Sequence, residues 1–331
     1  MKQYDVYGIG NALVDMEFEV HDQFFLSQKI DKGLMTLVDE KRQNELLEAL
    51  GTAPLKQQCG GSAANTMIAV SQLGGKSFYS CKVARDPIGN FYFQDLLEQG
   101  VDSNLKTQER EEGVTGKCLV MVTKDAERTM NTFLGITSTL SKHEVVPEGI
   151  KNAKYLYIEG YLVASPTGKD AAVHARKLAQ VHGVKTSLTF SDVNMVNFFR
   201  ESLLEIIGDG LDLIFCNEIE AQAFTGETDE AKIIQKLKLV AKTFVMTLGE
   251  RGAIVFDGKE ILRLGAQKIK PVDSNGAGDM YAGAFLYAIT NGASFEKAGE
   301  LAGIAAAKVV SQYGPRLKKD EVLTIKHKVL G

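Results

Sequence analysis

Apolar runs of strand length alternate with helix-like patterns along most of the chain. In residues 4–9 the apolar positions form one short run, whereas in residues 63–73 they recur three or four positions apart on one helical face. Repeated strand–helix units predict an α/β fold with a mostly parallel central sheet flanked by helices, whose ligands bind beyond the carboxyl ends of the strands. The ranges predicted as strands are 4–9, 77–83, 154–158, 185–190, 211–216, 244–248 and 253–256, and those predicted as helices are 63–73, 88–99, 166–182, 197–207 and 231–242.

Residues 16–38 and 113–134 break this alternation, because their patterns indicate short strands and turns. A turn at residues 124–127 would join two strands of the second segment as a hairpin. The period-two alternation places Val114, Cys118, Val120 and Val122 on one face of the first strand, and Arg128, Met130, Thr132 and Leu134 on one face of the second. We interpret both segments as a small β-sheet lid over a cleft; an edge extension of the main sheet is the plainer alternative.

The predicted division of the chain follows from these patterns. An α/β catalytic domain would comprise residues 1–15, 39–112 and 135–331, and the lid would comprise residues 16–38 and 113–134. A length of 331 residues fits two domains, or one large α/β domain with an insertion.

Composition narrows the class of protein. Hydrophobic residues make up 44% of the chain and charged residues 24%, and the formal net charge of −4 gives no broad basic surface for nucleic acid. No segment approaches the roughly 18 apolar residues of a membrane helix, and Asp5 stands where a secretory signal would be apolar. The cysteines lack zinc or redox spacing, so reduced thiols and a cytoplasmic location are expected. They are Cys59, Cys81, Cys118 and Cys216.

The stretch KPVDSNGAGDMYAGAFLYAITNG, residues 270–292, carries the most specific chemistry. Glycines before a helix let an anion approach the unpaired N–H groups of its first turn. A carboxylate at Asp279 would repel that anion, unless it takes a proton from an attacking hydroxyl while the amides of Gly276–Gly278 hold the transferring phosphoryl group. A structural role is the alternative, because a first-turn aspartate also complements the helix dipole.

Six motifs occur in the order found in the ribokinase-like (PfkB) carbohydrate and nucleoside kinases. They are GIGNALVD near the N-terminus, CGGSAANTMIAVSQLGG at 59–75, VARDPIGN at 83–90, NEIE at 217–220, TLGERGAIVF at 247–256 and DSNGAGD at 273–279. Each motif is weak alone, but together they span about residues 8 to 314. The chain therefore resembles this family, and the resemblance implies a ribokinase-like fold and an ATP-dependent phosphotransferase.

The resemblance assigns catalytic roles by matching motifs. Asp279 would be the catalytic base, and the backbone of Gly276, Ala277 and Gly278 would form the anion hole. Arg128 on the lid would screen charge on the transferring phosphoryl group. An exposed hairpin arginine is the plainer interpretation of that residue.

Asn217 and Glu220 match the Asn-x-x-Glu motif with which the family organises Mg²⁺ and phosphate, usually through water. The same pair would also form a helix-capping box. The resemblance further implies contacts to nucleotide, for which a plain turn and ordinary helix core are the alternatives. The residues concerned are Thr247, Gly249, Gly252, Asn275, Ala306, Ala307 and Val310. ATP and Mg²⁺ are thus the expected cofactors, and K⁺ is kept as a candidate because it activates some relatives.

For the acceptor, the resemblance implies Asn11, Asp15, Gly61 and Asn65. The carboxylate of Asp15 can accept from two hydroxyls, which suits a vicinal diol, and the amide of Asn65 can both donate and accept. The alternative places Asp15 on a solvated acidic strand face.

The nature of the acceptor depends on four apolar candidates, Leu37, Met130, Tyr161 and Leu162. A nucleoside needs a polar end for ribose and a flat apolar slot for the base, whereas a free sugar needs polar groups throughout. Their contexts resemble the adenosine kinase branch, where an aromatic ring stacks on the base, and either Tyr161 or Leu162 matches that position. Hydrophobic core is the plainer explanation of all four.

These features predict an adenosine kinase-like enzyme that phosphorylates the 5′-hydroxyl of a purine ribonucleoside, giving AMP from adenosine. A sugar kinase of the ribokinase or fructokinase type is the main alternative. A non-catalytic sensor would not need Asp279, and a nicotinamide-dependent oxidoreductase is disfavoured because Leu13 breaks the glycine pattern after Gly8 and Gly10. We expect no nucleic-acid or membrane partner, and either a monomer or a lid-mediated homodimer.

Overall fold

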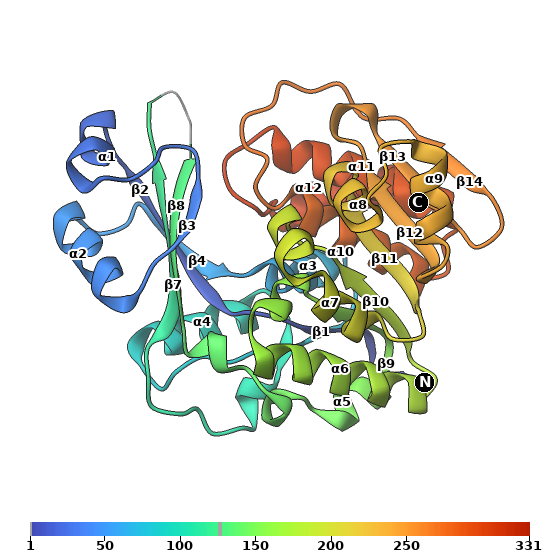
Figure 1. Cartoon of the computed structure of the whole chain (residues 1–331), viewed down its shortest axis with the longest axis horizontal. Helices are drawn as coiled ribbons and strands as arrows, with labels where there is room; N and C mark the ends of the chain where they lie inside the picture. Colours follow the sequence, from blue (N-terminus) through green and yellow to red (C-terminus); the bar gives the residue numbers. More distant parts are fainter. Residues whose placement is uncertain (1, 125–127) are drawn as a thin grey trace.

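The computed structural model describes residues 2–124 and 128–331 (Figure 1). Its main element is a nine-stranded sheet in the order β14-β13-β12-β11-β10-β9-β1-β5-β6. The strands from β12 to β6 run parallel, and β13 and β14 run antiparallel at one edge. The mostly parallel α/β sheet expected from the sequence pattern is therefore confirmed. Its strands are β1 (Tyr4–Ile9), β5 (Ser77–Ser80), β6 (Asp102–Ser103), β9 (Ala153–Ile158), β10 (Lys185–Thr189), β11 (Leu211–Asn217), β12 (Ala241–Thr247), β13 (Ala253–Phe256) and β14 (Ile261–Leu264).

Helices cover both faces of this sheet, and each face has its own apolar core. On one side lie α3 (Ser62–Gln72), α4 (Pro87–Glu98), α10 (Ala277–Thr290), α11 (Phe295–Val310) and α12 (Lys319–Leu330). On the other side lie α5 (Pro147–Lys151), α6 (Pro166–Val181), α7 (Val193–Ile207), α8 (Glu218–Thr225) and α9 (Glu230–Leu237). This arrangement leaves the carboxyl ends of the parallel strands open for a site.

A second, five-stranded sheet in the order β3-β8-β7-β2-β4 stands beside the main body, at the left of Figure 1. Its strands are β2 (Leu13–Glu19), β3 (Met35–Leu37), β4 (Lys56–Gly60), β7 (Thr115–Val122) and β8 (Arg128–Gly135). The helices α1 (Asp22–Gln28) and α2 (Glu40–Leu50) lie on its outer side. The inner side of the sheet is thus free to face the main body.

The predicted hairpin is confirmed in its pairing, because β7 and β8 are antiparallel with Val122 opposite Arg128. Its predicted turn falls mostly on residues 125–127, which lie outside the described residues. Residues 16–38 are not only strands and turns, since α1 forms within them. The strand β4 was also not predicted, because KQQCG carries no apolar alternation and pairs with β2 through its backbone.

Two elements end clearly earlier than predicted. The helix expected over 231–242 ends at Leu237, because Ala241 pairs with Leu211 and starts β12. The strand expected over 77–83 ends at Ser80, and the side chain of Asn104 then bonds both backbone groups of Cys81. In both cases contacts from distant parts of the chain override the local pattern.

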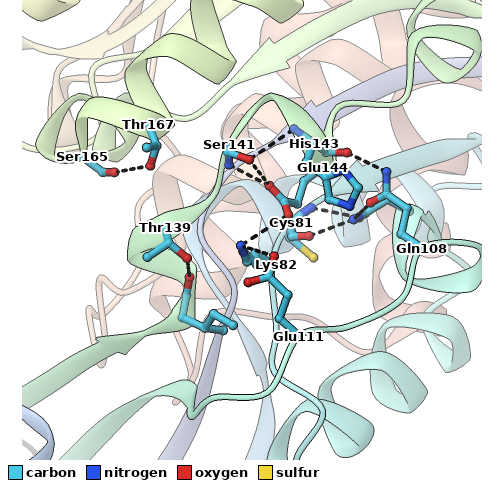
Figure 2. Close-up of polar contacts among 12 residues, drawn as sticks. Cys81, Lys82, Gln108, Glu111, Thr139, Ser141, His143, Glu144, Ser165 and Thr167 are labelled. Atoms are coloured by element: carbon cyan, nitrogen blue, oxygen red, sulfur yellow. Dashed lines mark hydrogen bonds and ion pairs between the residues drawn. The ribbon is translucent and has the colours of Figure 1, made fainter.

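Past the end of β5, Lys82 is buried within a set of polar contacts that we call the Lys82 network, made of Lys82, Glu111, Ser141 and Glu144 (Figure 2). The Nζ of Lys82 lies 2.9 Å from Glu111 Oε1 and 3.6 Å from Glu144 Oε1. Glu144 Oε2 accepts from the backbone N–H of Ser141 at 2.7 Å and from its hydroxyl at 3.0 Å. The network ties two loops to the end of β5.

Two sequence-based expectations concern the protein as a whole. Among the described residues, no helix is both long enough and apolar enough to cross a membrane. Each of the four cysteines is buried and has a free thiol.

Candidate active site

A cavity of about 460 Å³ lies where the small sheet faces the carboxyl ends of the main strands. Its size falls within the range of small-molecule sites. Most residues predicted for the acceptor and for catalysis line it, and so do some of those predicted for nucleotide and Mg²⁺, although all of them come from widely separated parts of the chain. Those lining residues are Asn11, Asp15, Leu37, Gly61, Asn65, Met130, Tyr161, Asn217, Glu220, Thr247, Asn275, Gly276, Gly278 and Asp279.

The floor of the cavity lies at the point where the chain leaves β1 and β9, the topological switch point of the sheet. Glu159 follows β9 and is buried, and its carboxylate accepts from the backbone N–H of Asn11 at 3.1 Å and from the Asn11 side chain at 3.0 Å. The other Glu159 oxygen accepts from the N–H of Ala63 at 2.8 Å, and burial raises the pKa of Glu159 to about 7. Gly61 has φ 104°, and a Cβ there would lie 2.2 Å from the carbonyl oxygen of Asn11. Glycine is therefore required for this close approach.

Asp279 lies in the first turn of α10, as the sequence predicts, and is half-buried in the cavity wall. The hydroxyl of Ser62 donates to its Oδ1 at 2.6 Å, and the amide of Asn65 donates to its Oδ2 at 3.1 Å. Burial raises the pKa of Asp279 to about 6, although these two hydrogen bonds partly oppose the shift. The carboxylate is therefore held in one orientation by neutral donors and has an affinity for protons above that of an ordinary aspartate.

The N-terminus of α10 meets the cavity beside this carboxylate. Gly276 is the N-cap with φ 74°, and a Cβ there would lie 2.4 Å from the Pro315 side chain, so only glycine fits. Gly276 and Gly278 line the cavity, while Ala277 begins the helix and is half-buried outside the wall. The first N–H groups of the helix are free of intrahelical partners, which makes this end suited to an anion.

Asp15 projects from β2 into the same cavity. Burial raises its pKa to about 6, and the positive charges of Arg316 and Arg128 partly oppose the shift. Of the acidic residues alternating on this strand, only the outermost, Glu19, is exposed. The face is thus not uniformly solvated, and its inner end supplies a carboxylate to the cavity.

The part of the cavity wall formed by β3, β7 and β8 of the small sheet is mostly apolar. Met130 and Leu37 lie on the paired strands β8 and β3, and both line the cavity. The alternation predicted for the hairpin also places Cys118, Val120, Thr132 and Leu134 there. Tyr161 lines the cavity from the main body, whereas Leu162 is buried in the core and does not reach the wall. Leu162 is therefore a core residue, because it lies on the inner side of the turn after β9.

The Asn217–Glu220 pair forms the capping box of α8 and lines the cavity at the same time. Asn217 Oδ1 accepts from the N–H of Glu220 at 2.8 Å, and Glu220 Oε2 accepts from the N–H of Asn217 at 2.9 Å. Burial, together with the nearby charge of Asp192, raises the pKa of Glu220 to about 7. A buried carboxylate close to another carboxylate suits a divalent cation bound through water. Within residues 2–124 and 128–331, no cluster of three or more His, Cys, Asp or Glu side chains could hold a metal directly.

The residues predicted for nucleotide divide into two groups. Thr247 and Asn275 line the cavity. Gly249 and Gly252 form a tight turn between β12 and β13, with a hydrogen bond of 2.8 Å from the N–H of Leu248 to the carbonyl of Gly252. The described wall of the cavity does not include that turn or the half-buried residues on α11, which are Ala306, Ala307 and Val310.

Arg128 lies at the start of β8, outside the wall of this cavity, and its guanidinium reaches two carboxylates. Its Nη2 lies 3.2 Å from Glu17 Oε2, and its Nε lies 3.1 Å from Asp273 Oδ2. The residue is therefore not an exposed hairpin arginine, because its side chain is 10% exposed. It ties the small sheet to the loop that precedes α10.

Ser62, Glu159 and Arg316 hold predicted site residues in place, but they were not found from the sequence. Ser62 stands inside the CGGSAANTMIAVSQLGG motif, so the motif itself was the available signal. Glu159 follows a predicted strand, where a carboxylate at the carboxyl end of a parallel strand indicates a site. Arg316 lies in a loop after α11 and carries no local signal.

The chain is similar to known kinases in sequence and in fold. The sequence model described as pfkB family carbohydrate kinase matches residues 36–321. The solved adenosine kinase from Sinorhizobium meliloti is 36% identical with a TM-score of 0.88, over 98% of this chain and 99% of that one. The solved probable sugar kinase from Rhizobium etli CFN 42 is 34% identical with a TM-score of 0.89, over 99% of both chains. The adenosine kinase of Saccharomyces cerevisiae is 27% identical, over 95% of this chain and 97% of the yeast protein.

Proposed function

Because the chain belongs to the pfkB family of carbohydrate kinases, we propose that it is an adenosine kinase-like enzyme that phosphorylates the 5′-hydroxyl of a purine ribonucleoside. The observation that carries the proposal is the two-sided cavity. One side is polar, with Asn11, Asp15 and Asn65, whereas the part of the wall formed by β3, β7 and β8 of the small sheet is mostly apolar. A ribose fits the first side and a flat base fits the second.

The transfer step follows from the position of Asp279. The carboxylate takes the proton of the acceptor hydroxyl as that oxygen forms a bond to the γ-phosphorus of ATP, and the bond from phosphorus to the β–γ bridging oxygen breaks. Ser62 and Asn65 hold the two carboxylate oxygens, so the base is oriented before the acceptor arrives. A pKa of about 6 leaves Asp279 ionised at neutral pH, in the form that accepts a proton.

The amides at the start of α10 hold the transferring phosphoryl group in this proposal, with Gly276 and Gly278 open to the cavity. ATP is the phosphoryl donor that the kinase family implies, and in this proposal Thr247 and Asn275, which line the cavity, contact it. Mg²⁺, when bound, neutralises phosphate charge, and Asn217 and Glu220 would hold it through water.

On the acceptor side, Asp15 accepts hydrogen bonds from paired ribose hydroxyls, and Asn11 and Asn65 complete the polar floor. In this proposal the purine base of the nucleoside lies between the ring of Tyr161 and the side chains of Leu37 and Met130 on the small sheet. We also propose that the small sheet acts as a lid whose closed position Arg128 stabilises through Asp273.

A sugar kinase is the second candidate, and the dense polar floor favours it. Glu159 brings a buried carboxylate with a pKa of about 7 to the cavity wall, in addition to Asp15. A free sugar would use such acceptors on several hydroxyls. A free sugar has no flat apolar group, so this candidate does not explain the apolar residues of the small sheet that line the cavity.

A panel assay separates the two candidates. ADP release is measured with Mg-ATP and adenosine, inosine, guanosine, ribose or fructose as acceptor. The proposal predicts turnover with adenosine at micromolar KM and little turnover with free sugars. Turnover with a free sugar alone would overturn the nucleoside assignment while leaving the role of Asp279 intact.

A further inference from the structure

Arg316 places a buried positive charge directly behind the candidate base. Its side chain is 9% exposed and comes from the loop between α11 and α12. Its Nη1 lies 3.4 Å from Asp95 Oδ2, and its Nη2 lies 3.2 Å from the sulfur of Cys59. Its Nε donates to Asn65 Oδ1 at 3.1 Å. The guanidinium is thus held on two edges and presents its third donor to Asn65.

This contact decides which way the Asn65 amide points. A guanidinium can only donate, so the amide must turn its oxygen toward Arg316. The amide nitrogen then faces Asp279, where it donates to Oδ2 at 3.1 Å. With the amide reversed, the nitrogen would face the guanidinium, and both Arg316 and Asp279 would lose a partner.

The loop that carries Arg316 is also fixed against the phosphate-binding end of α10. The N–H of Gly314 donates to Asp273 Oδ2 at 2.8 Å, and Pro315 packs against Gly276 so closely that a Cβ there would lie 2.4 Å away. One loop therefore contacts Gly276 through Pro315 and reaches the base indirectly, through Arg316 and then Asn65.

We propose that Arg316 is a positioning residue for phosphoryl transfer, which fixes the Asn65 amide and through it the orientation of the Asp279 carboxylate. The proposal rests on the role of Asp279 as base but not on the choice of acceptor. It assigns a role to the cluster of Arg316, Asp95 and Cys59, which lies behind the cavity rather than in its wall.

The charge of Arg316 gives the proposal a pH signature. Its positive charge holds down the pKa of both Asp279 and Asp15, against the larger effect of burial. Loss of that charge therefore raises both pKa values, and the acid limb of kcat/KM moves to higher pH. Among the described residues, the charged and titratable groups that face this cluster and the two carboxylates are Asp15, Lys56, Cys59, Tyr92, Asp95, Cys118, Arg128, Tyr157, Glu159 and Tyr161.

The test compares Arg316→Met and Arg316→Lys with the wild type, on whichever acceptor of the panel is phosphorylated. Arg316→Met is expected to lower kcat on the order of 10- to 100-fold, because the base is misoriented, and to move the acid limb of kcat/KM upward. Arg316→Lys keeps the buried charge and is the variant expected to fold if Arg316→Met does not. It should lose kcat while the acid limb stays near that of the wild type.

Lys82→Met is the matched control, since it removes another buried cation whose partners do not line the cavity. It should leave the acid limb in place. Full kcat in Arg316→Lys, or an unmoved acid limb in a folded Arg316→Met, would overturn the proposal. Retained turnover in Asp279→Asn would be a different result, because it would show that Asp279 is not the catalytic base and would overturn the proposed function itself.

Discussion

Lys82 and Arg316 are two cations of equal burial with different surroundings, since each side chain is 9% exposed. The partners of Lys82 are the carboxylates of Glu111 and Glu144 (Figure 2), and neither of them lines the cavity. One partner of Arg316 is Asn65, which contacts the candidate base. Burial of a charge therefore does not by itself indicate a role in catalysis. The indication comes from the residues that its hydrogen-bond partners contact.

The carboxylates of the two regions differ in the same way. Glu144 lies beside Lys82 and accepts two further hydrogen bonds from Ser141. Asp279 receives its hydrogen bonds from the neutral groups of Ser62 and Asn65, and its pKa rises to about 6. A carboxylate that is oriented but not neutralised by a direct ion pair keeps its ability to take a proton.

The largest expected effect is on turnover. Asp279→Asn should lower kcat by about 10²- to 10⁴-fold, because the amide cannot accept the acceptor's proton. Nucleotide binding, measured by calorimetry, should stay within a few-fold of the wild type. Turnover near that of the wild type would mean that the base lies elsewhere.

Lys82→Met should act on stability instead. Removing Lys82 leaves the buried Glu144 without its cation, which costs about 3–5 kcal/mol of the free energy of unfolding. Urea unfolding measures this loss, and kcat of the folded fraction should be unchanged. Lys106→Met is the control, since its ion pair with Asp102 is half-exposed and should contribute less than about 1 kcal/mol. A fall in the kcat of folded Lys82→Met would contradict this prediction, because it would show that the Lys82 network also affects turnover.

Asp15→Ala should weaken acceptor binding by about 10- to 100-fold, because hydrogen bonds to a charged group contribute about 1.5–3 kcal/mol. The KM for the acceptor should rise while the KM for ATP changes little. Glu19→Ala is the matched control on the same strand, since Glu19 is exposed and Asp15 lines the cavity. Equal acceptor KM values for the two variants would mean that Asp15 does not bind the acceptor and belongs to a solvated acidic strand face.

The smallest effect is on the pH dependence of stability. The pKa of Asp279 rises from its ordinary 3.8 to about 6 on folding. The stability linked to its protonated form is therefore full below about pH 4 and is lost as the pH rises through about 6. Asp279→Asn removes this loss, so its Tm relative to the wild type should be a few degrees higher at pH 8 than at pH 5. A Tm difference that is constant with pH would contradict the raised pKa.

How much of the site could be read from the sequence depends on the range of the contacts. Asp279 and its glycines lie in one motif at a helix start, where local geometry alone places them. The alternation in the hairpin likewise predicted one common face for Met130 and Leu134, and both line the cavity. The helix α1 and the strand β4 had no comparable pattern and were missed.

The sequence by itself determined the alternating α/β architecture, the β7–β8 hairpin and the residues of the motifs, because each depends on neighbours in the chain. Only the tertiary structure decided which of Tyr161 and Leu162 reaches the cavity. It also joined Ser62 to Asp279 and Arg316 to Asn65, pairs that lie 217 and 251 residues apart. No local period connects such pairs, since the packing of α3 against α10 and the loop after α11 brings them together.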